Sequence, residues 1–243
     1  MFRELEIQDR FSAARACGFT AVEFLHPQAW PIIEVKSWLT EASLELILIN
    51  TPPGDGETGL ACLAGREEEF RRLFTDTLTY ASELGAGMIH LLAGRASGAD
   101  AESLFTENVR WAADLAARHG IRIMLEPLNT RDVPGYLHTH CDHTARLIER
   151  IDRANVQMQF DFYHSQIMGG DLAASIERHL HLIGHIQFSS LPGRHEPQYG
   201  EVNAHWLFDT IDRLGYPGWI GCEYVARGDT RAGLSWGKAF GLG

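Results

Sequence analysis

The stretch IRIMLEPLN, which spans Ile121 to Asn129, decides how the rest of the chain is interpreted. Its first five residues are mostly apolar or β-branched, as in a buried strand, and the run ends in Glu126 followed by Pro127. Because proline has no N–H to donate to a sheet ladder, the strand must end near that point. The sequence therefore predicts a carboxylate at the C-terminal tip of a strand, where parallel α/β folds place their active sites. A strand-end glutamate that faces solvent is the simpler alternative for this residue taken alone.

The same arrangement recurs at three later positions. Apolar runs end in Asp161 within QFDFYH, in Gln187 within GHIQF and in Glu223 within GCEY. The successive intervals, counted from Glu126, are 35, 26 and 36 residues, and each roughly matches one strand–loop–helix–loop unit of about 30 residues or more. Four ligand-type side chains can therefore occupy equivalent strand tips, and in a barrel these tips converge on one mouth.

Three carboxylates and an amide oxygen in one pocket need a positive charge among them. An all-oxygen set suits a hard divalent cation such as Mg²⁺ or Mn²⁺ better than it suits zinc. The predicted metal ligands are Glu126, Asp161, Gln187 and Glu223. In the alternative interpretation each residue caps its own strand, which explains one such residue more easily than four at matching offsets.

Strand and helix patterns alternate along the chain without a linker or low-complexity segment. Strands are expected at residues 20–24, 44–49, 88–92, 121–126, 156–161, 182–188 and 219–223. Helices are expected at residues 4–17, 31–42, 66–84, 101–119, 142–153, 171–180, 203–214 and 230–240. This alternation predicts a parallel sheet with helical crossovers, and the number of units favours an α/β fold with one (β/α)8 TIM barrel domain over residues 1–243. The chain opens on a helix at residues 4–17. We therefore expect either that the first strand of the barrel is missing from this chain or that the barrel is incomplete at that seam.

Composition restricts the partners of the chain. A 45% hydrophobic and 22% charged content is ordinary for a soluble globular protein, and the formal net charge is −11. The acidic balance and the absence of a Lys/Arg-rich stripe argue against nucleic acid or an anionic membrane as partner. The four cysteines form no C-x-x-C pair, and no signal peptide or membrane-length apolar run occurs, so a cytoplasmic protein with reduced thiols is expected. The open seam makes a homo-oligomer a candidate.

Two further residues are candidates for substrate binding. His164 lies three positions after a predicted ligand and can reach a substrate oxygen, although a lone loop histidine is more often structural. Arg194 lies in a Gly/Pro-rich loop and can grip a carboxylate in bidentate fashion, with a solvated surface arginine as the alternative. His138, His140 and His143 are spaced like metal ligands, but their place at the start of a surface helix favours capping and solvation.

Taken together, the motifs resemble those of the hydroxypyruvate isomerase and 2-oxotetronate isomerase family, within the xylose-isomerase-like TIM barrel superfamily. The resemblance covers nearly the whole chain and is carried by Gly18–Phe24, Pro53–Asp55, Gly65–Phe70, Glu126–Asn129, Val133–Gly135, Asp161–His164, His185–Gln187, Pro192–Pro197, Gly200–Glu201 and Gly218–Tyr224. It implies a divalent metal on the four residues named above and implies acid/base roles for Glu126 and Glu223. Two features depart from the family pattern. Relatives begin with an additional strand, and at the barrel mouth this chain has Ser189-Ser190 and Gln198-Tyr199 where relatives usually have Ala-Asp and Gly-Thr.

The resemblance implies a metal-dependent isomerase of the aldose–ketose type. The expected reaction converts hydroxypyruvate to tartronate semialdehyde through an enediolate. A 2-oxotetronate isomerase or a ketose 3-epimerase would use the same chemistry on a longer substrate. From other classes, an endonuclease IV-like nuclease would want a basic face and a histidine-rich zinc cluster, and a non-catalytic metal-binding barrel would have lost activity with the missing strand.

Overall fold

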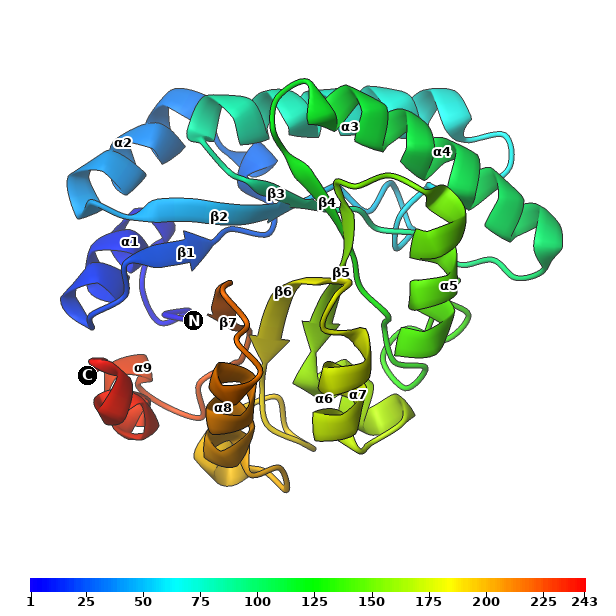
Figure 1. Ribbon diagram of the computed structural model, residues 1–243. Helices are drawn as coiled ribbons and strands as arrows, with labels where there is room; N and C mark the ends of the chain where they lie inside the picture. Colours follow the sequence, from blue (N-terminus) through cyan, green and yellow to red (C-terminus); the bar gives the residue numbers. More distant parts are fainter.

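The sheet of the molecule is an incomplete barrel. The computed structural model describes residues 1–243. Its seven strands are β1 (Ala21–Glu23), β2 (Glu45–Asn50), β3 (Met88–His90), β4 (Arg122–Leu125), β5 (Val156–Asp161), β6 (Ile183–Phe188) and β7 (Ile220–Cys222). They form one sheet in sequence order, and every neighbouring pair is parallel. The strands curve around a common axis (Figure 1), which confirms the predicted barrel with a strand missing.

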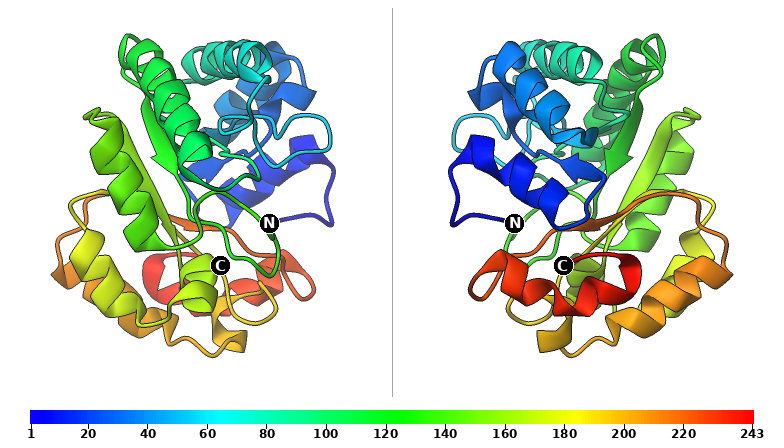
Figure 2. Two further views of the ribbon diagram at one scale, coloured as in Figure 1. Left: turned by 90° about the vertical axis from the view of Figure 1, so that its right-hand side faces the viewer. Right: turned by 90° about the vertical axis from the view of Figure 1, so that its left-hand side faces the viewer.

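Helices cover the outer face of the sheet (Figure 2). The α-helices are α1 (Ile7–Ala16), α2 (Ile32–Ala42), α3 (Glu67–Leu84), α4 (Ala99–Ala117), α5 (Cys141–Ile151), α6 (Phe162–Met168), α7 (Leu172–His179), α8 (Ala204–Arg213) and α9 (Thr230–Gly233). Three 3-10 segments, η1 (Pro27–Ala29), η2 (Pro197–Tyr199) and η3 (Leu234–Phe240), complete the chain. None of the helices combines the length and apolar character needed to cross a membrane.

Most of the predicted elements are confirmed within a few residues at their ends, but the region after β5 differs. The sequence pattern predicts one helix there, at residues 171–180, whereas the structure has α6 before it. The carboxylate of Asp161 accepts a hydrogen bond from the Tyr163 backbone N–H at 2.6 Å, which caps α6 directly at the end of β5. The predicted last helix, residues 230–240, is split between α9 and η3.

The strand register brings the predicted site residues to one end of the barrel. Asp161 on β5 is paired with Gln187 on β6, and Gln187 is paired with Gly221 on β7. All six residues of β6 and all but one of β5 are buried, as expected for strands of a parallel sheet with side chains packed on both faces. The closed part of the barrel therefore holds Asp161 and Gln187 side by side.

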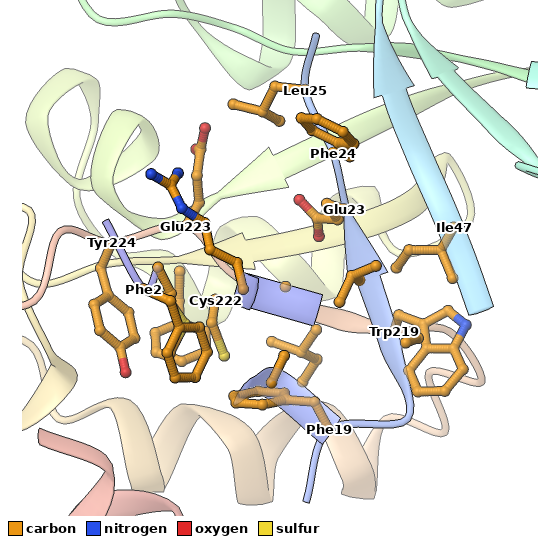
Figure 3. A pocket seen from close by; sticks show the side chains of 18 of the residues that line it. Phe2, Phe19, Glu23, Phe24, Leu25, Ile47, Trp219, Cys222, Glu223 and Tyr224 are labelled. Atoms are coloured by element: carbon orange, nitrogen blue, oxygen red, sulfur yellow. The ribbon is translucent and has the colours of Figure 1, made fainter. Parts of the chain in front are cut away.

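The barrel is open between β1 and β7, because each of these strands pairs with only one neighbour. A cavity of about 1010 Å³ fills this seam and is lined mostly by apolar side chains. Figure 3 shows its walls, with Phe24 on the side of β1, Trp219 and Tyr224 around β7, and Phe2 from the first residues of the chain. Both chain termini also lie on this side of the molecule (Figures 1 and 2). The expectation of an open seam is thus confirmed.

Candidate active site

Glu126 follows β4 directly and is almost fully buried, with 4% of its surface exposed. Its Oε2 lies 3.5 Å from Nδ1 of His90, and its Oε1 has no hydrogen-bond partner. Burial lowers the pKa of His90 to about 3, so this imidazole is neutral and does not balance the carboxylate charge. Burial, and then the charges of Glu223 and Asp161, raise the pKa of Glu126 well above its usual range.

Asp161 is the last residue of β5 and is completely buried. One carboxylate oxygen, Oδ1, caps α6 as described above. The other, Oδ2, has no hydrogen-bond partner and lies 3.7 Å from the Arg194 guanidinium and 4.0 Å from Nε2 of His164. Oδ2 is thus an acceptor directed into the site rather than into the fold.

The histidine His164, on α6, is oriented by the loop after β4. Its Nδ1 accepts a hydrogen bond from the Asn129 backbone N–H at 3.0 Å and lies 2.8 Å from the Asn129 side-chain amide. Since burial lowers the pKa of His164, the ring is neutral and its proton is on Nε2. Ligand atoms of Glu126, Asp161 and His164 lie within 4.8 Å of one another. The tautomer nevertheless makes Nε2 of His164 a donor, as a substrate contact requires, rather than a metal ligand.

Glu223 follows β7 and faces the open seam, so its side chain keeps 26% of its surface exposed (Figure 3). Its Oε2 accepts a hydrogen bond from Arg194 at 2.9 Å. Desolvation, and next the charge of Asp161, raise the pKa of Glu223 to about 8, although Arg194 opposes the shift. The Arg194 guanidinium also lies 4.7 Å from the centre of the Tyr163 ring. The predicted residues Arg194 and Glu223 therefore belong to the same site.

Gln187 is completely buried and has both ends of its carboxamide engaged. Its Nε2 donates to the carboxylate of Glu23, and its Oε1 accepts from Nε2 of Gln159 at 2.5 Å. The other carboxylate oxygen of Glu23 lies 2.6 Å from Nε2 of His185. Sequence reasoning named Gln187 but neither of the groups that hold it.

The donor set suits a hard divalent cation. Oε1 of Glu126, Oδ2 of Asp161 and Oε1 of Gln159 are buried oxygens without hydrogen-bond partners, and such oxygens are costly unless something satisfies them. Three carboxylates share the site with one nearby guanidinium, that of Arg194. A divalent ion on carboxylate and amide oxygens would supply both the missing partner and the missing charge.

Several functional neighbours were missed from the sequence. His90 ends β3 and obeys the same strand-tip rule that identified Glu126, so that rule could have found it. Glu23 ends β1 in the same way. The prediction for the histidines before α5 was partly wrong. His138 is buried and hydrogen bonded to Thr144, and His140, at the N-cap position, makes no side-chain capping bond.

The family model of the xylose isomerase-like TIM barrel matches residues 11–240 of the chain. The chain belongs to this family. Among curated proteins it is 44% identical to a 2-oxo-tetronate isomerase of Cupriavidus necator, over 99% of this chain and 95% of the relative. It is also 39% identical to the hydroxypyruvate isomerase of Escherichia coli, over 97% and 94%. These relatives confirm the prediction that the chain is an isomerase.

Solved structures show the same fold. A crystal structure described as AP endonuclease, family 2, from Brucella melitensis superposes with a TM-score of 0.96 at 42% identity, and the match covers 99% of this chain and 95% of that one. The apo form of a 3-keto-D-glucoside 4-epimerase from E. coli superposes with a TM-score of 0.79 at 22% identity, covering 96% and 94%. The second likeness concerns the barrel alone.

Proposed function

We propose that the chain is a metal-dependent isomerase of a small 2-oxo acid with a hydroxyl group beside its carbonyl. The observation that carries this proposal is the gathering of three carboxyl groups at one mouth: ligand atoms of Glu126 and Asp161 lie within 4.8 Å of one another, and Arg194 contacts both Asp161 and Glu223. Two carboxyl groups placed in this way, Glu126 and Glu223, can take a proton from one substrate carbon and return it to the neighbouring one. Isomerisation of a hydroxy ketone needs two such transfers at adjacent carbons.

The proposed reaction moves hydrogen within the substrate. One of the two glutamates removes the proton from the hydroxyl-bearing carbon, which leaves an enediolate. The same or the other glutamate returns a proton to the neighbouring carbon, while the hydroxyl proton passes to the former carbonyl oxygen, so that the hydroxyl and carbonyl exchange places without change in composition.

Two positive or donor groups would orient the substrate. Arg194 can pair with the substrate carboxylate, which then competes with Glu223 for the guanidinium. Nε2 of His164 carries a proton, faces Asp161 and can donate to a substrate oxygen. Substrate entry that draws Arg194 away from Glu223 would remove the one hydrogen bond that the structure gives this carboxylate, and so strengthen it as a base.

The metal is part of the proposal, with Glu126, Asp161, Gln187 and Glu223 as its ligands and Mg²⁺ or Mn²⁺ as the preferred ions. The unpartnered oxygens of Glu126 and Asp161 support this set. When bound, such an ion would act as a Lewis acid that stabilises negative charge on substrate oxygens. Glu223 would join the set through Oε1, or through Oε2 once that oxygen gives up its hydrogen bond to Arg194.

Hydroxypyruvate is the substrate that we favour, with tartronate semialdehyde as product. A 2-oxotetronate is the alternative, because relatives of similar identity carry either name, and a ketose 3-epimerase would use the same chemistry. A nuclease is the rival from another class, since one closely similar structure carries an endonuclease name. The net charge of −11 and the carboxylate-rich site argue against it.

The test is proton exchange followed by NMR in D₂O, with hydroxypyruvate or a 2-oxotetronate and added Mg²⁺ or Mn²⁺. Wild-type protein is expected to incorporate deuterium and form the isomer, and Glu223→Gln to lose both by about 10²- to 10⁴-fold. Glu201→Gln is the control, because Glu201 is exposed. Its deuterium incorporation and product formation should match those of the wild type. Exchange with the 2-oxotetronate alone would identify the tetronate, not hydroxypyruvate, as the substrate. Absence of exchange with every 2-oxo acid or sugar would refute the proposal that the chain is an isomerase.

A further inference from the structure

Glu23 links β1 to β6 across the open seam of the barrel. It ends β1, yet its carboxylate lies against β6, where it contacts His185 and Gln187. To reach them it passes β7 at Gly221, where a Cβ atom would lie only 1.8 Å from Oε1 of Glu23. The glycine therefore makes room for a carboxylate that crosses the seam.

The chemistry of Glu23 sets the orientation of the Gln187 amide. A carboxylate has no proton to donate, so Gln187 must turn its NH₂ group toward Glu23 and its Oε1 away from it. Gln159 then donates one hydrogen bond to that oxygen and leaves a second lone pair free. His185 likewise must carry its proton on Nε2 to donate to Glu23. The order of donors and acceptors admits one arrangement only.

This arrangement turns the oxygen of Gln187, rather than its NH₂ group, toward Gln159, whose own Oε1 is a buried oxygen without a hydrogen-bond partner. Gln187 lies in register with Asp161, whose Oδ2 is one of the unpartnered buried oxygens. A flipped Gln187 would offer two N–H donors in place of the oxygen, which a cation cannot use as a ligand.

We infer that Glu23 is a positioning residue, which fixes the Gln187 carboxamide with its oxygen available to the divalent ion. The inference rests on the proposed function, because it assumes that Gln187 is a ligand. His185 supports the same orientation by donating to the second oxygen of Glu23. A purely structural role, in which Glu23 only ties β1 to β6 across the seam, is the competing explanation.

The first test compares Mn²⁺ binding by calorimetry and electron paramagnetic resonance in wild type, Glu23→Gln and Glu4→Gln. An amide at position 23 that accepts from His185 turns its own NH₂ group toward Gln187 and favours the flipped carboxamide. The Mn²⁺ dissociation constant of Glu23→Gln is expected to rise about 10- to 100-fold. Glu4 is the matched control, because its carboxylate accepts from Thr230 on the same side of the molecule and touches none of the proposed ligands. Its variant should bind Mn²⁺ as the wild type does.

The second test separates positioning from the mere loss of a negative charge, which would also weaken cation binding. In a double-mutant cycle with Gln187→Ala, an effect that acts through the amide disappears, whereas a Coulombic effect persists. We expect Glu23→Gln to leave the Mn²⁺ affinity of Gln187→Ala unchanged. An equal loss in both backgrounds would overturn the inference, as would a Glu23→Gln protein that melts at lower temperature without metal but binds Mn²⁺ normally. A wild-type protein that binds no Mn²⁺ would instead refute the metal site itself.

Discussion

The two sides of the barrel differ in how completely they are packed. On the side of β4, β5 and β6 most strand residues are buried, and β5 and β6 share four registered pairs. On the side of β1 and β7 no residue of β1 is fully buried, and each strand has an unpaired edge. The proposed site spans both, since Asp161 and Gln187 come from the packed side whereas Glu223 lies at the open one. The packed side can keep the side chains of Asp161 and Gln187 in fixed positions, whereas the open side leaves Glu223 partly exposed.

The largest expected difference between the two sides is in stability. Phe160 on β5 is completely buried, and Phe24, just after β1, lines the seam cavity and contacts Phe11 and Trp30. Phe160→Ala should lower the free energy of unfolding by about 3–5 kcal/mol. Phe24→Ala should cost roughly half of that or less, because a side chain beside a void already lacks contacts on one side. Urea denaturation of the two variants measures the difference, and equal losses would show that the seam is as well packed as the barrel interior.

Much of this comparison was accessible from the sequence, and the reasons are physical. Apolar runs that end in Glu126, Asp161, Gln187 and Glu223 carry a local signal, because strand and tip are adjacent in the chain. The bond from Glu23 to Gln187 has no such signal, since 164 positions separate the two residues and only the closure of the barrel brings them together. Helix α6 was missed because its cap, Asp161, had been interpreted only as a ligand. The seam was predicted from a strand count, but its cavity depends on how side chains fill it.

Replacing Arg194 should weaken substrate binding more than replacing Arg227, an arginine that also stacks on a tyrosine ring but lies outside the site. Its guanidinium stacks on Tyr163 and bonds to Glu223, whereas that of Arg227 stacks on Tyr199, with 4.6 Å between the guanidinium carbon and the ring centre. Arg194→Ala is expected to raise KM for a 2-oxo acid about 10- to 100-fold, because one charge-assisted carboxylate contact of about 1.5–3 kcal/mol is lost. Arg227→Ala should leave KM unchanged. Steady-state kinetics measures KM for both variants. Equal changes in KM would show that Arg194 does not contact the substrate.

Filling the seam should make the open side resemble the packed one. A six-residue apolar strand joined ahead of Met1 can pair with the free edges of β1 and β7 and bury side chains in the cavity of about 1010 Å³. After the cost of ordering the strand, a net gain of about 1–2 kcal/mol would raise the melting temperature by roughly 2–8 °C. A Gly/Ser extension of equal length is the control. If both extensions give the same melting temperature in scanning calorimetry, the cavity does not accept a strand.

The pH dependence of stability tests how strongly the open side desolvates Glu223. Because its pKa rises from 4.5 to about 8 on folding, the folded chain retains a proton that the unfolded chain releases between these values. The stabilisation is fully present below about pH 4.5 and is lost as the pH rises through 8. In metal-free protein the melting temperature should therefore fall from pH 5 to pH 8, and fall less in Glu223→Gln than in wild type or Glu201→Gln. Some decline should remain in Glu223→Gln, because the raised pKa of Glu126 acts in the same direction. If Glu223→Gln and wild type instead decline in parallel, solvent entering through the seam keeps Glu223 ionised, and Glu126 on the packed side is the one carboxyl group with a pKa suited to proton return.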